Sequence, residues 1–518
     1  MRVLLIVWLA LFMGTALAAP APKYWILLKA KDPAAAPALS AAALQRRQVQ
    51  QLTIDDTDRP VAPAYLSALG QLGVKPICQS RWLNAVSAQL TPEQRRLVAS
   101  LPFVKALHPI DPSIIITSMG GSRTTTDPAE GIKPALAPVM TQIQASDFGQ
   151  AGLTGRFVTI GVIDAGFFGA DSANALKHIF ARNGIRQVRD YVDDARTHND
   201  LFRTLETMAD FHGTEVMAAI AGSDPQENRQ YGLATDATFY LARSDQGNRE
   251  YRGEEDNWVA AMEWMDSLGV RLVNTSLGYA QGMSNPKENY QPSQMDGHTS
   301  LISRAAQLAA DKKGMLIIVS AGNEGEDRSW RVISTPADAQ GVLAVGATNA
   351  KYWNRIGYSS IGPEPLPYLK PNVACFSLYG TSLSAPVITG FAACLMQARP
   401  DLSNKELLAI IEKSAHLYPY GNNYVGYGVP LASRALALLR NQPLPATARL
   451  VKATGKSLDL PITTSDQSVS VFRKKDATHV IRQEVVKVAR GRISLRRDNH
   501  EARTTVDLKT EVIEVVWP

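Results

Sequence analysis

Apolar runs that each lead to a single polar side chain constrain the fold of this chain most strongly. One run covers residues 158–163 and ends at Asp164, and another covers residues 316–319 and leads through a glycine to Asn323. Such runs, bounded by turn residues, are typical of buried strands in a parallel sheet. In open α/β sheets, ligands bind outside the carboxyl ends of the strands. We therefore expect Asp164 and Asn323 at the functional edge of a sheet.

Strand-like and helix-like segments alternate from about residue 150 onward. The expected strands cover residues 237–243, 271–276, 315–321 and 342–348. The expected helices cover residues 256–268, 301–312 and 403–415, and Ser403 with Glu406 forms a capping box at the start of the last. This alternation predicts an α/β fold, in which a central, mostly parallel sheet is covered by helices on both faces.

Two further segments place a histidine and a serine where helices are expected to begin. His212 precedes Gly213 and a run of small residues, so its helix could pack close to the sheet. Ser382 lies in Gly-Thr-Ser-Leu-Ser-Ala-Pro, ahead of another small-residue helix. Each feature alone has an ordinary structural interpretation, because serine caps helices and asparagine or aspartate often lies in turns.

The four side chains complement each other chemically. Imidazole can take the proton of a serine hydroxyl near neutral pH, which would make Ser382 the nucleophile and His212 the general base and acid. A buried carboxylate, Asp164, would orient the imidazole. The amide of Asn323 and the backbone N–H of Ser382 would stabilise charge on a carbonyl oxygen. The sequence therefore predicts an acyl-transfer site.

The order Asp, His, Ser and the motifs Val-Ile-Asp-Ala-Gly, His-Gly-Thr, Ala-Gly-Asn and Gly-Thr-Ser-Leu-Ser-Ala-Pro resemble those of the subtilisin-like (subtilase) serine endopeptidases. The resemblance covers roughly residues 140–440. It implies a three-layer subtilisin-like fold, the triad Asp164, His212 and Ser382, and Asn323 as oxyanion donor. It further implies that an extended peptide pairs with two backbone segments: Ser276, Leu277 and Gly278, and Ser320, Ala321 and Gly322.

Other enzyme classes fit less well. An α/β-hydrolase would need Gly-x-Ser-x-Gly and the order Ser, Asp, His, and a dinucleotide-binding protein would need Gly-x-Gly-x-x-Gly after a strand. The chemistry requires no cofactor. No Asp-x-Asp-x-Asp-Gly loop indicates calcium, although relatives often build structural calcium sites from backbone carbonyls.

Two departures from the family pattern keep a second function open. Ala165 follows Asp164 where relatives often have a hydroxyl residue, so one hydrogen bond to Asp164 is expected to be missing. The approach to Ser382, residues 374–381, is shorter than in relatives. The first hypothesis is a serine endopeptidase acting through an acyl-enzyme on Ser382. The second is a catalytically impaired subtilase-fold protein that serves as a peptide-binding or scaffold module.

The N-terminal region indicates a secreted precursor. Residues 1–18 have the charged start, apolar core and small-x-small site of a signal peptide, with cleavage expected after Ala18, so we expect a secreted, periplasmic or cell-surface protein. Residues 19–115 resemble a subtilase propeptide, with strands expected at 24–28, 82–90 and 103–110 and helices at 39–51, 65–72 and from Pro92. In the family this unit is an intramolecular chaperone and inhibitor. Residues 116–140 are expected to form the linker and maturation region.

The remaining regions are a peptidase domain, residues 141–440, and a small β-rich domain, residues 445–518, with strands expected at 468–472, 479–488, 492–495 and 512–516. The expected partners are polypeptide substrates and the chain's own propeptide. A net charge of +6, without a dense basic run, indicates no nucleic acid. The sequence has no second long apolar run, so we expect no transmembrane segment in the mature chain. Cys375 and Cys394 are expected as buried free thiols in preference to a disulfide.

Overall fold

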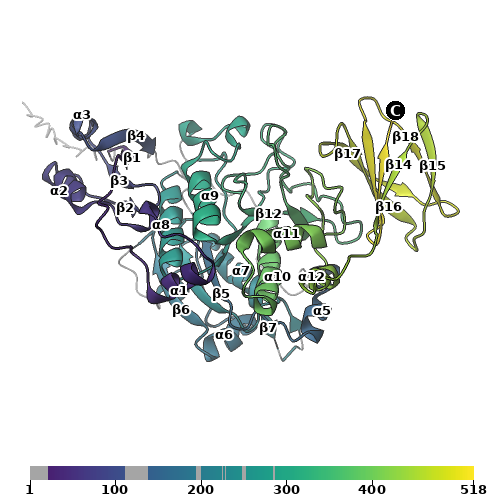
Figure 1. Ribbon diagram of the computed structural model, residues 1–518, viewed down its shortest axis with the longest axis horizontal. Coiled ribbons are helices and arrows are strands. Elements are labelled where there is room, and N and C mark those ends of the chain that lie inside the picture. The colour runs from purple at the N-terminus through teal and green to yellow at the C-terminus, as the bar shows by residue number, and fades with distance from the viewer. Residues whose placement is uncertain are drawn as a thin grey trace, which may run out of the picture.

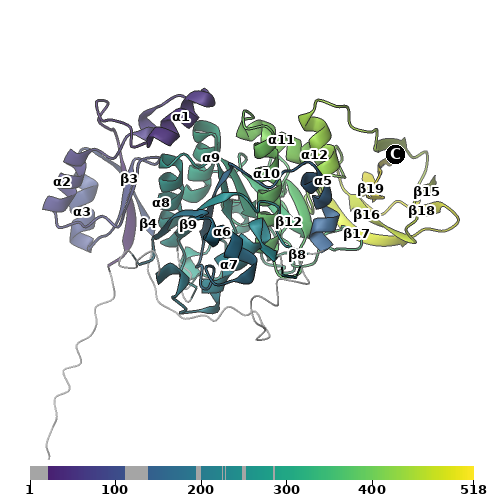
Figure 2. The same ribbon diagram turned by 90° about the horizontal axis from the view of Figure 1, so that it is seen from below.

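The computed structural model describes residues 21–110, 138–193, 200–224, 226–227, 229–247, 252–283 and 286–518. These residues form three parts in a row, which Figures 1 and 2 show from two directions. We call residues 21–110 the N-terminal part, residues 138–444 the central part and residues 445–518 the tail. The predicted signal peptide and most of the predicted linker lie outside the described residues.

A seven-stranded parallel sheet forms the middle layer of the central part. Its strand order is β13-β12-β11-β10-β5-β9-β6. In the middle of the sheet, Val273 of β10 pairs with Gly161 of β5 on one side and with Ile317 of β11 on the other. The strands are β5 Thr159–Asp164, β6 Ile185–Asp190, β9 Thr238–Arg243, β10 Leu272–Thr275, β11 Leu316–Ser320, β12 Leu343–Thr348 and β13 Val373–Phe376. The predicted parallel sheet is confirmed.

Helices cover both faces of this sheet. Because successive side chains of a strand point to opposite faces, Val162 enters one hydrophobic core and Ile163 enters the other. The first core contains residues of α5 Ala145–Gln150, α6 Lys177–Ala181, α7 His212–Ala221, α10 Ala385–Ala398, α11 Asn404–Ser414 and α12 Ala432–Leu439. The second contains residues of α8 Glu254–Ser267 and α9 Leu301–Lys313. The predicted three-layer arrangement is confirmed, and the capping box of Ser403 and Glu406 forms.

Short elements complete the central part. They are the hairpin of β7 Ser223–Asp224 and β8 Arg229–Gln230 and the single-turn helices η2 Asn174–Leu176, η3 Asp200–Phe202, η4 Met208–Phe211, η5 Pro286–Glu288, η6 Pro292–Gln294 and η7 Thr381–Leu383. Among the described residues, the helical stretch Thr381–Ala398 is long and apolar enough to cross a membrane by composition. However, 78% of it is buried inside the protein, as expected for a core helix.

The N-terminal part is an antiparallel sheet of order β2-β3-β1-β4. Its elements are β1 Lys23–Leu28, α1 Ala41–Val49, η1 Asp56–Asp58, α2 Pro63–Gln71, β2 Cys78–Ser80, β3 Ala85–Gln89, α3 Pro92–Ser100 and β4 Val104–Ile110. One face packs on α2 and α3, and the other packs on Ala260 of α8 and Leu301 of α9. Residues 29–62, between β1 and α2, form an extension that contains α1, and we call it the arm.

One expected strand of this part is shorter than predicted. The strand expected at residues 82–90 begins only at Ala85. The backbone N–H groups of Arg81 and Trp82 instead donate hydrogen bonds to the carboxylate of Glu263, at 2.9 and 3.0 Å, which holds the preceding turn against the central part.

The tail is rich in strands, as predicted. It contains a sheet of order β14-β20-β19-β16-β17 and the pair β15-β18. The strands are β14 Ala448–Lys452, β15 Ser457–Pro461, β16 Ser468–Lys474, β17 Val480–Lys487, β18 Arg492–Arg496, β19 Arg503–Asp507 and β20 Val512–Val516. Three of these, β14, β15 and β19, were not predicted, because polar residues dominate β19 and most side chains of the other two are at least partly exposed.

Candidate active site

The predicted site residues lie on four neighbouring elements of the central part. Asp164 is the last residue of β5, and His212 is the first residue of α7. Asn323 follows β11, and Ser382 lies in η7, directly ahead of α10. The turn η7 contacts both α7 and β11, and α7 contacts β5. The structure therefore brings the elements that carry all four residues together.

Asp164 and His212 form a hydrogen-bonded pair. The carboxylate oxygen Oδ1 of Asp164 lies 2.7 Å from Nδ1 of His212, and the Asp164 side chain is fully buried while 18% of the His212 side chain is exposed. In the neutral imidazole, a proton on Nδ1 that is donated to the carboxylate would leave the lone pair on Nε2. This is the tautomer that a general base at His212 requires.

The second oxygen of Asp164 is less well satisfied. Oδ1 also accepts a hydrogen bond from the backbone N–H of Ala165 at 2.8 Å, whereas Oδ2 is buried and has no hydrogen-bond partner among the described residues. A methyl group cannot donate to it. The unpaired Oδ2 agrees with the expectation that Asp164 lacks one hydrogen bond because residue 165 has no hydroxyl group.

Helix α7 lies against the residues that follow β5. The backbone N–H of Gly213 donates to the carbonyl oxygen of Gly166 at 2.9 Å. A Cβ atom at position 213 would lie 2.3 Å from that oxygen, so only glycine fits there. The close packing that the small residues of this segment predict is observed, and it fixes His212 beside Asp164.

Arg243, at the end of β9, is a residue that the sequence analysis missed. Its buried guanidinium donates to the carbonyl oxygen of Ala165 at 2.9 Å and forms ion pairs with Asp190 at 3.2 Å and Asp210 at 3.5 Å. It thereby connects the residue after Asp164 to the segment before His212. The available signal was a cationic residue ending an apolar strand next to β5.

Ser382 is tied to the segment that follows β10. Its Oγ donates to the carbonyl oxygen of Ser276 at 3.2 Å, and Oγ of Ser276 donates to the carbonyl oxygen of Ser382 at 2.9 Å. Ser276, Leu277 and Gly278 follow β10, and Ser320, Ala321 and Gly322 continue from β11, its parallel neighbour. The two backbone segments predicted to bind peptide therefore leave adjacent strands.

The orientation of the Asn323 amide is set by Thr381. The backbone N–H and the hydroxyl of Thr381 both donate to Oδ1 of Asn323, at 2.9 and 3.1 Å. Since both donors face Oδ1, Nδ2 is left to point away from Thr381. Gly380 has a φ of +111°, which favours glycine. The sequence analysis treated Thr381 only as part of a motif and missed this role.

The cysteines offer no competing nucleophile. Cys78, Cys375 and Cys394 are all free and buried, so the predicted free thiols are confirmed. Burial raises the pKa of Cys394 to about 12 and also raises the pKa of Cys375. Thiols with such pKa values are protonated and unreactive near neutral pH.

Models of two protein families match this chain. The model of the subtilase family matches residues 155–428, and that of the Bacteroidota peptidase S8 propeptide domain matches residues 23–121. Subtilisin DY of Bacillus licheniformis is 27% identical over 277 residues, which cover 51% of this chain and 86% of that protein. Subtilisin E of Bacillus subtilis is 26% identical over 305 residues, covering 56% and 68%.

A solved structure extends the likeness in fold. The epidermin leader peptide processing serine protease of Staphylococcus aureus superimposes with a TM-score of 0.54 at 14% identity, over 81% of this chain and 99% of that one. At this identity the likeness concerns the fold alone.

Proposed function

Because the chain belongs to the subtilase family of serine peptidases, we propose that it is a secreted endopeptidase that hydrolyses peptide bonds through an acyl-enzyme on Ser382. The observation that carries this proposal is the 2.7 Å contact between the buried Asp164 and His212, whose helix α7 contacts the Ser382 turn. The family match spans all four predicted site residues.

The proposed reaction begins with an extended peptide paired as an added strand. The peptide would lie between residues 276–278 and residues 320–322. Rotation about the Cα–Cβ bond of Ser382 would release its hydroxyl from the carbonyl oxygen of Ser276. His212 Nε2 would then take the hydroxyl proton while Oγ attacks the peptide carbonyl carbon.

The negative charge that forms on the carbonyl oxygen would be held by Nδ2 of Asn323 and the backbone N–H of Ser382. His212 would next give its proton to the leaving amine, and the C–N bond would break to leave an ester on Ser382. Water, deprotonated by His212, would hydrolyse that ester and restore the hydroxyl. This chemistry uses no cofactor.

The N-terminal part would act as the inhibitor of the same chain. The match of residues 23–121 to a peptidase S8 propeptide supports this role. We place the maturation cut in residues 116–140, so that residues 19–115 separate from the peptidase domain. Delivery of the precursor would depend on cleavage of the signal peptide after Ala18.

The test is covalent labelling of the processed protein with a fluorophosphonate, together with turnover of denatured casein. We expect labelling that maps to Ser382 by mass spectrometry and is absent in Ser382→Ala. Ser384→Ala, two residues away, is the matched control and should still be labelled. The Ser382→Ala precursor should remain uncut. A correctly processed wild-type protein that neither reacts nor cleaves casein would instead support the peptide-binding or scaffold function.

The Asn323 role has a separate test. Asn323→Leu keeps the side-chain size but removes Nδ2, and it should lower kcat by about 100-fold to 1000-fold, the loss known for one oxyanion donor in a subtilisin. KM for a peptide substrate should change little, because the interaction forms mainly in the transition state. An unchanged kcat would remove Asn323 from the site.

A further inference from the structure

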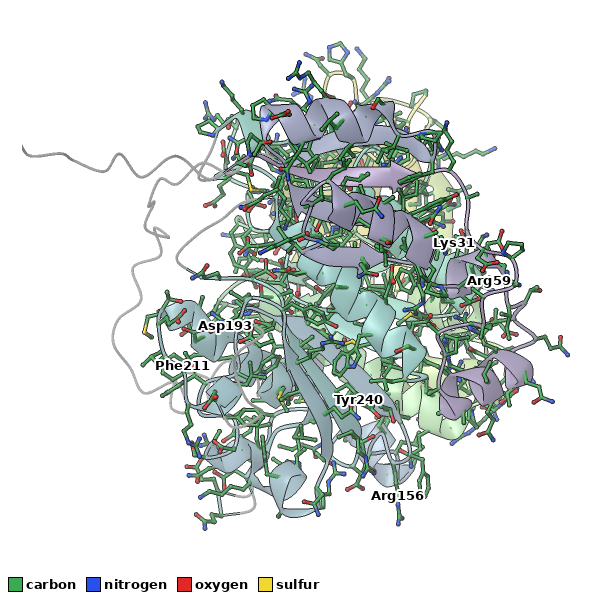
Figure 3. The ribbon with its side chains drawn as sticks, turned by 90° about the vertical axis from the view of Figure 1, so that its left-hand side faces the viewer. Lys31, Arg59, Arg156, Asp193, Phe211 and Tyr240 are labelled. Atoms are coloured by element: carbon green, nitrogen blue, oxygen red, sulfur yellow. The ribbon has the colours of Figure 1, made fainter. Side chains whose placement is uncertain are left out.

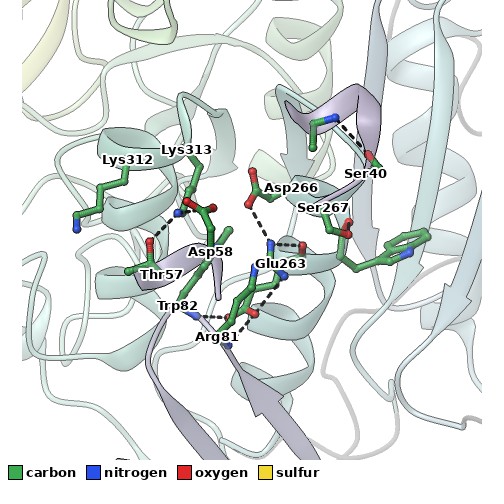
Figure 4. Close-up of polar contacts among 12 residues, drawn as sticks. Ser40, Thr57, Asp58, Arg81, Trp82, Glu263, Asp266, Ser267, Lys312 and Lys313 are labelled. Carbon is green, nitrogen blue, oxygen red and sulfur yellow. Dashed lines mark hydrogen bonds and ion pairs between the residues drawn. The ribbon is translucent and has the colours of Figure 1, made fainter. Parts of the chain in front are cut away.

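A row of buried charges of alternating sign connects the arm to helices α8 and α9. Figure 4 shows Lys313 with Asp58 at one end of this row and Asp266 at the other. The row starts at Lys313 of α9 and passes through Asp58 and Arg47 of the arm to Asp266 of α8. The three contacts are 2.8 Å from Lys313 Nζ to Asp58 Oδ1, 2.8 Å from Arg47 Nη2 to Asp58 Oδ1 and 2.9 Å from Arg47 Nη2 to Asp266 Oδ2. Each charge in the row therefore has a partner of opposite sign, and two of the three pairs join the arm to the central part.

Asp266 is the centre of this cluster. Its fully buried carboxylate receives Arg46 Nη2 at 2.5 Å, Arg47 Nη2 at 2.9 Å and Arg81 Nη2 at 2.9 Å. All three arginines belong to the N-terminal part. Removing a partner from a buried ion pair is far more costly than removing one from an exposed pair, because the remaining charge is left unpaired.

The arm also satisfies backbone groups at the ends of both helices. Arg46 Nη1 donates to the carbonyl oxygen of Lys313, and Arg47 Nη1 donates to that of Lys312 at 3.1 Å. The backbone N–H of Ser40 donates to the carbonyl oxygen of Ser267 at 2.9 Å. These carbonyls lie in the last turns of α8 and α9, where intrahelical donors are lacking and the helix dipole favours cations. The arm thus caps two helix C-termini at once.

The sheet of the N-terminal part makes a separate contact further along α8. Glu263 accepts hydrogen bonds from Ser80 Oγ at 2.6 Å and from the backbone N–H of Arg81 at 2.9 Å. Near the start of α8, Asp256 pairs with Lys23 at 2.6 Å. The N-terminal part is therefore attached at several points along one helix, with the arm at its C-terminal end.

The arm lies away from the candidate active site. Figure 3 shows Lys31 and Arg59, both in the arm, on one side of the molecule, and Phe211, the neighbour of His212, on the other. Contacts made by the arm therefore do not depend on whether the active site is occupied.

We propose that the arm is a second anchor, independent of the active site, which keeps the N-terminal part on α8 and α9 as a bound subunit after the connecting chain is cut. The proposal rests on the proposed function only for that cut. Cutting removes the covalent link but none of the contacts around Asp266. Dissociation would have to break every one of these buried pairs, so it should be slow.

The experiment uses the full-length Ser382→Ala chain with a recognition site for an added, site-specific protease inserted within residues 118–127. After the added protease has cut, the dissociation rate constant of the two pieces is measured by dilution and size-exclusion chromatography. We expect the unsubstituted pair to stay together and the Arg46→Gln/Arg47→Gln pair to dissociate at least about 100-fold faster. Asp266→Asn should behave like the double variant.

Lys312→Gln is the matched control. Lys312 pairs with Asp55 at 2.7 Å across the same interface, but 53% of its side chain is exposed, so its loss should change the rate by less than about five-fold. Arg46→Lys/Arg47→Lys keeps the charges but not the planar donors, and an intermediate rate is expected. Circular dichroism of the uncut chains checks that each variant is folded. If the Arg46→Gln/Arg47→Gln variant does not fold, the dissociation rate of the Arg46→Lys/Arg47→Lys variant provides the comparison instead.

Equal dissociation rates for the unsubstituted and arginine-substituted pairs would overturn the proposal, as would rapid separation of the unsubstituted pair. Because Ser382 is absent from all of these chains, the result does not depend on peptidase activity. Failure of the proposed function would appear only as missing fluorophosphonate labelling of the wild-type protein, so the two failures are distinguishable.

Discussion

The N-terminal part and the tail are attached to the central part by different forces. Buried ion pairs hold the arm of the N-terminal part on α8 and α9, whereas the tail inserts Phe472 and Val512 into an apolar cluster with Leu417, Tyr424 and Val425 of the central part. Separated ionic surfaces are solvated again by water, but separated apolar surfaces cost about 25 cal/mol per Å². The difference teaches that the arm is held by specific charge pairs, each of which needs its partner, whereas the tail is held by apolar packing and shares a core with the central part.

The largest effect should come from removing a large apolar side chain from the contact between the tail and the central part. Phe472 is fully buried, and Phe472→Ala should lower the free energy of unfolding by about 3–5 kcal/mol, because it leaves a cavity between the tail and the central part. Urea denaturation in a Ser382→Ala background measures this loss. Val485→Ala, at a position that is 40% exposed on β17, should change stability by less than about 0.5 kcal/mol. A loss below about 1 kcal/mol for Phe472→Ala would remove the contrast between the two attachments.

The second effect concerns pH and the helix on which the N-terminal part lies. Burial raises the pKa of Glu255, in the first turn of α8, from 4.5 to about 7. Between these two pH values the folded protein keeps a proton that the unfolded chain has lost, so the free energy of unfolding falls as the pH rises through this window. The fall due to Glu255 should be about 3 kcal/mol.

Glu255→Gln should remove this part of the pH dependence, which urea denaturation at pH 4.5 and at pH 8 would measure. Glu364→Gln, whose side chain is 64% exposed in a surface pair with Lys475, is the control and should keep the wild-type profile. The same fall in stability in Glu255→Gln as in the wild type would show that other groups generate it.

A smaller effect is expected at a buried polar contact between the tail and the central part. Nε2 of His416 lies 3.1 Å from Oδ2 of Asp507, and both side chains are fully buried. Asp507→Asn keeps the shape but weakens this bond, and it should lower the free energy of unfolding by about 1–2 kcal/mol. A loss as large as that of Phe472→Ala would show that the tail, too, depends on charge.

The smallest effect is expected for the exposed pair of Lys475 and Glu364, which joins the tail to the central part at 2.6 Å. Lys475→Gln should change the free energy of unfolding by less than about 0.5 kcal/mol, because exposed ion pairs are largely compensated by water. A thermal unfolding series against salt concentration checks this. A larger loss would mean that surface charge contributes to the tail attachment as well.

Local patterns in the sequence were sufficient to predict most of the central fold. The apolar runs that lead to Asp164 and Asn323 form β5 and β11 of one parallel sheet, with β10 between them, and the predicted capping box of Ser403 and Glu406 forms at α11. The departure at Ala165 also predicted a local feature, the unpaired oxygen of Asp164. Each of these depends on residues close together in the chain.

Features that depend on distant residues could not be predicted in this way. Arg47 and Asp266 are separated by 219 positions, and neither lies in a motif. Strand β19, Arg503–Asp507, is mostly buried but consists mainly of polar residues, and two of them, Arg503 and Thr505, contact the carboxylate of Glu514 on β20. Such contacts become visible only when the tertiary structure is known.

The reactivity of Cys78 should report whether the N-terminal part is bound to the central part. Its sulfur lies 3.5 Å from the carbonyl oxygen of Asp256 on the central part, and burial between the two parts raises the pKa of the thiol well above its usual value. With the N-terminal part in place, the native protein should therefore resist thiol reagents at all three cysteines. Dissociation of that part would expose Cys78 to water and allow its thiolate to form. The fraction of Cys78 that is alkylated would then equal the fraction of molecules in which the two parts have separated.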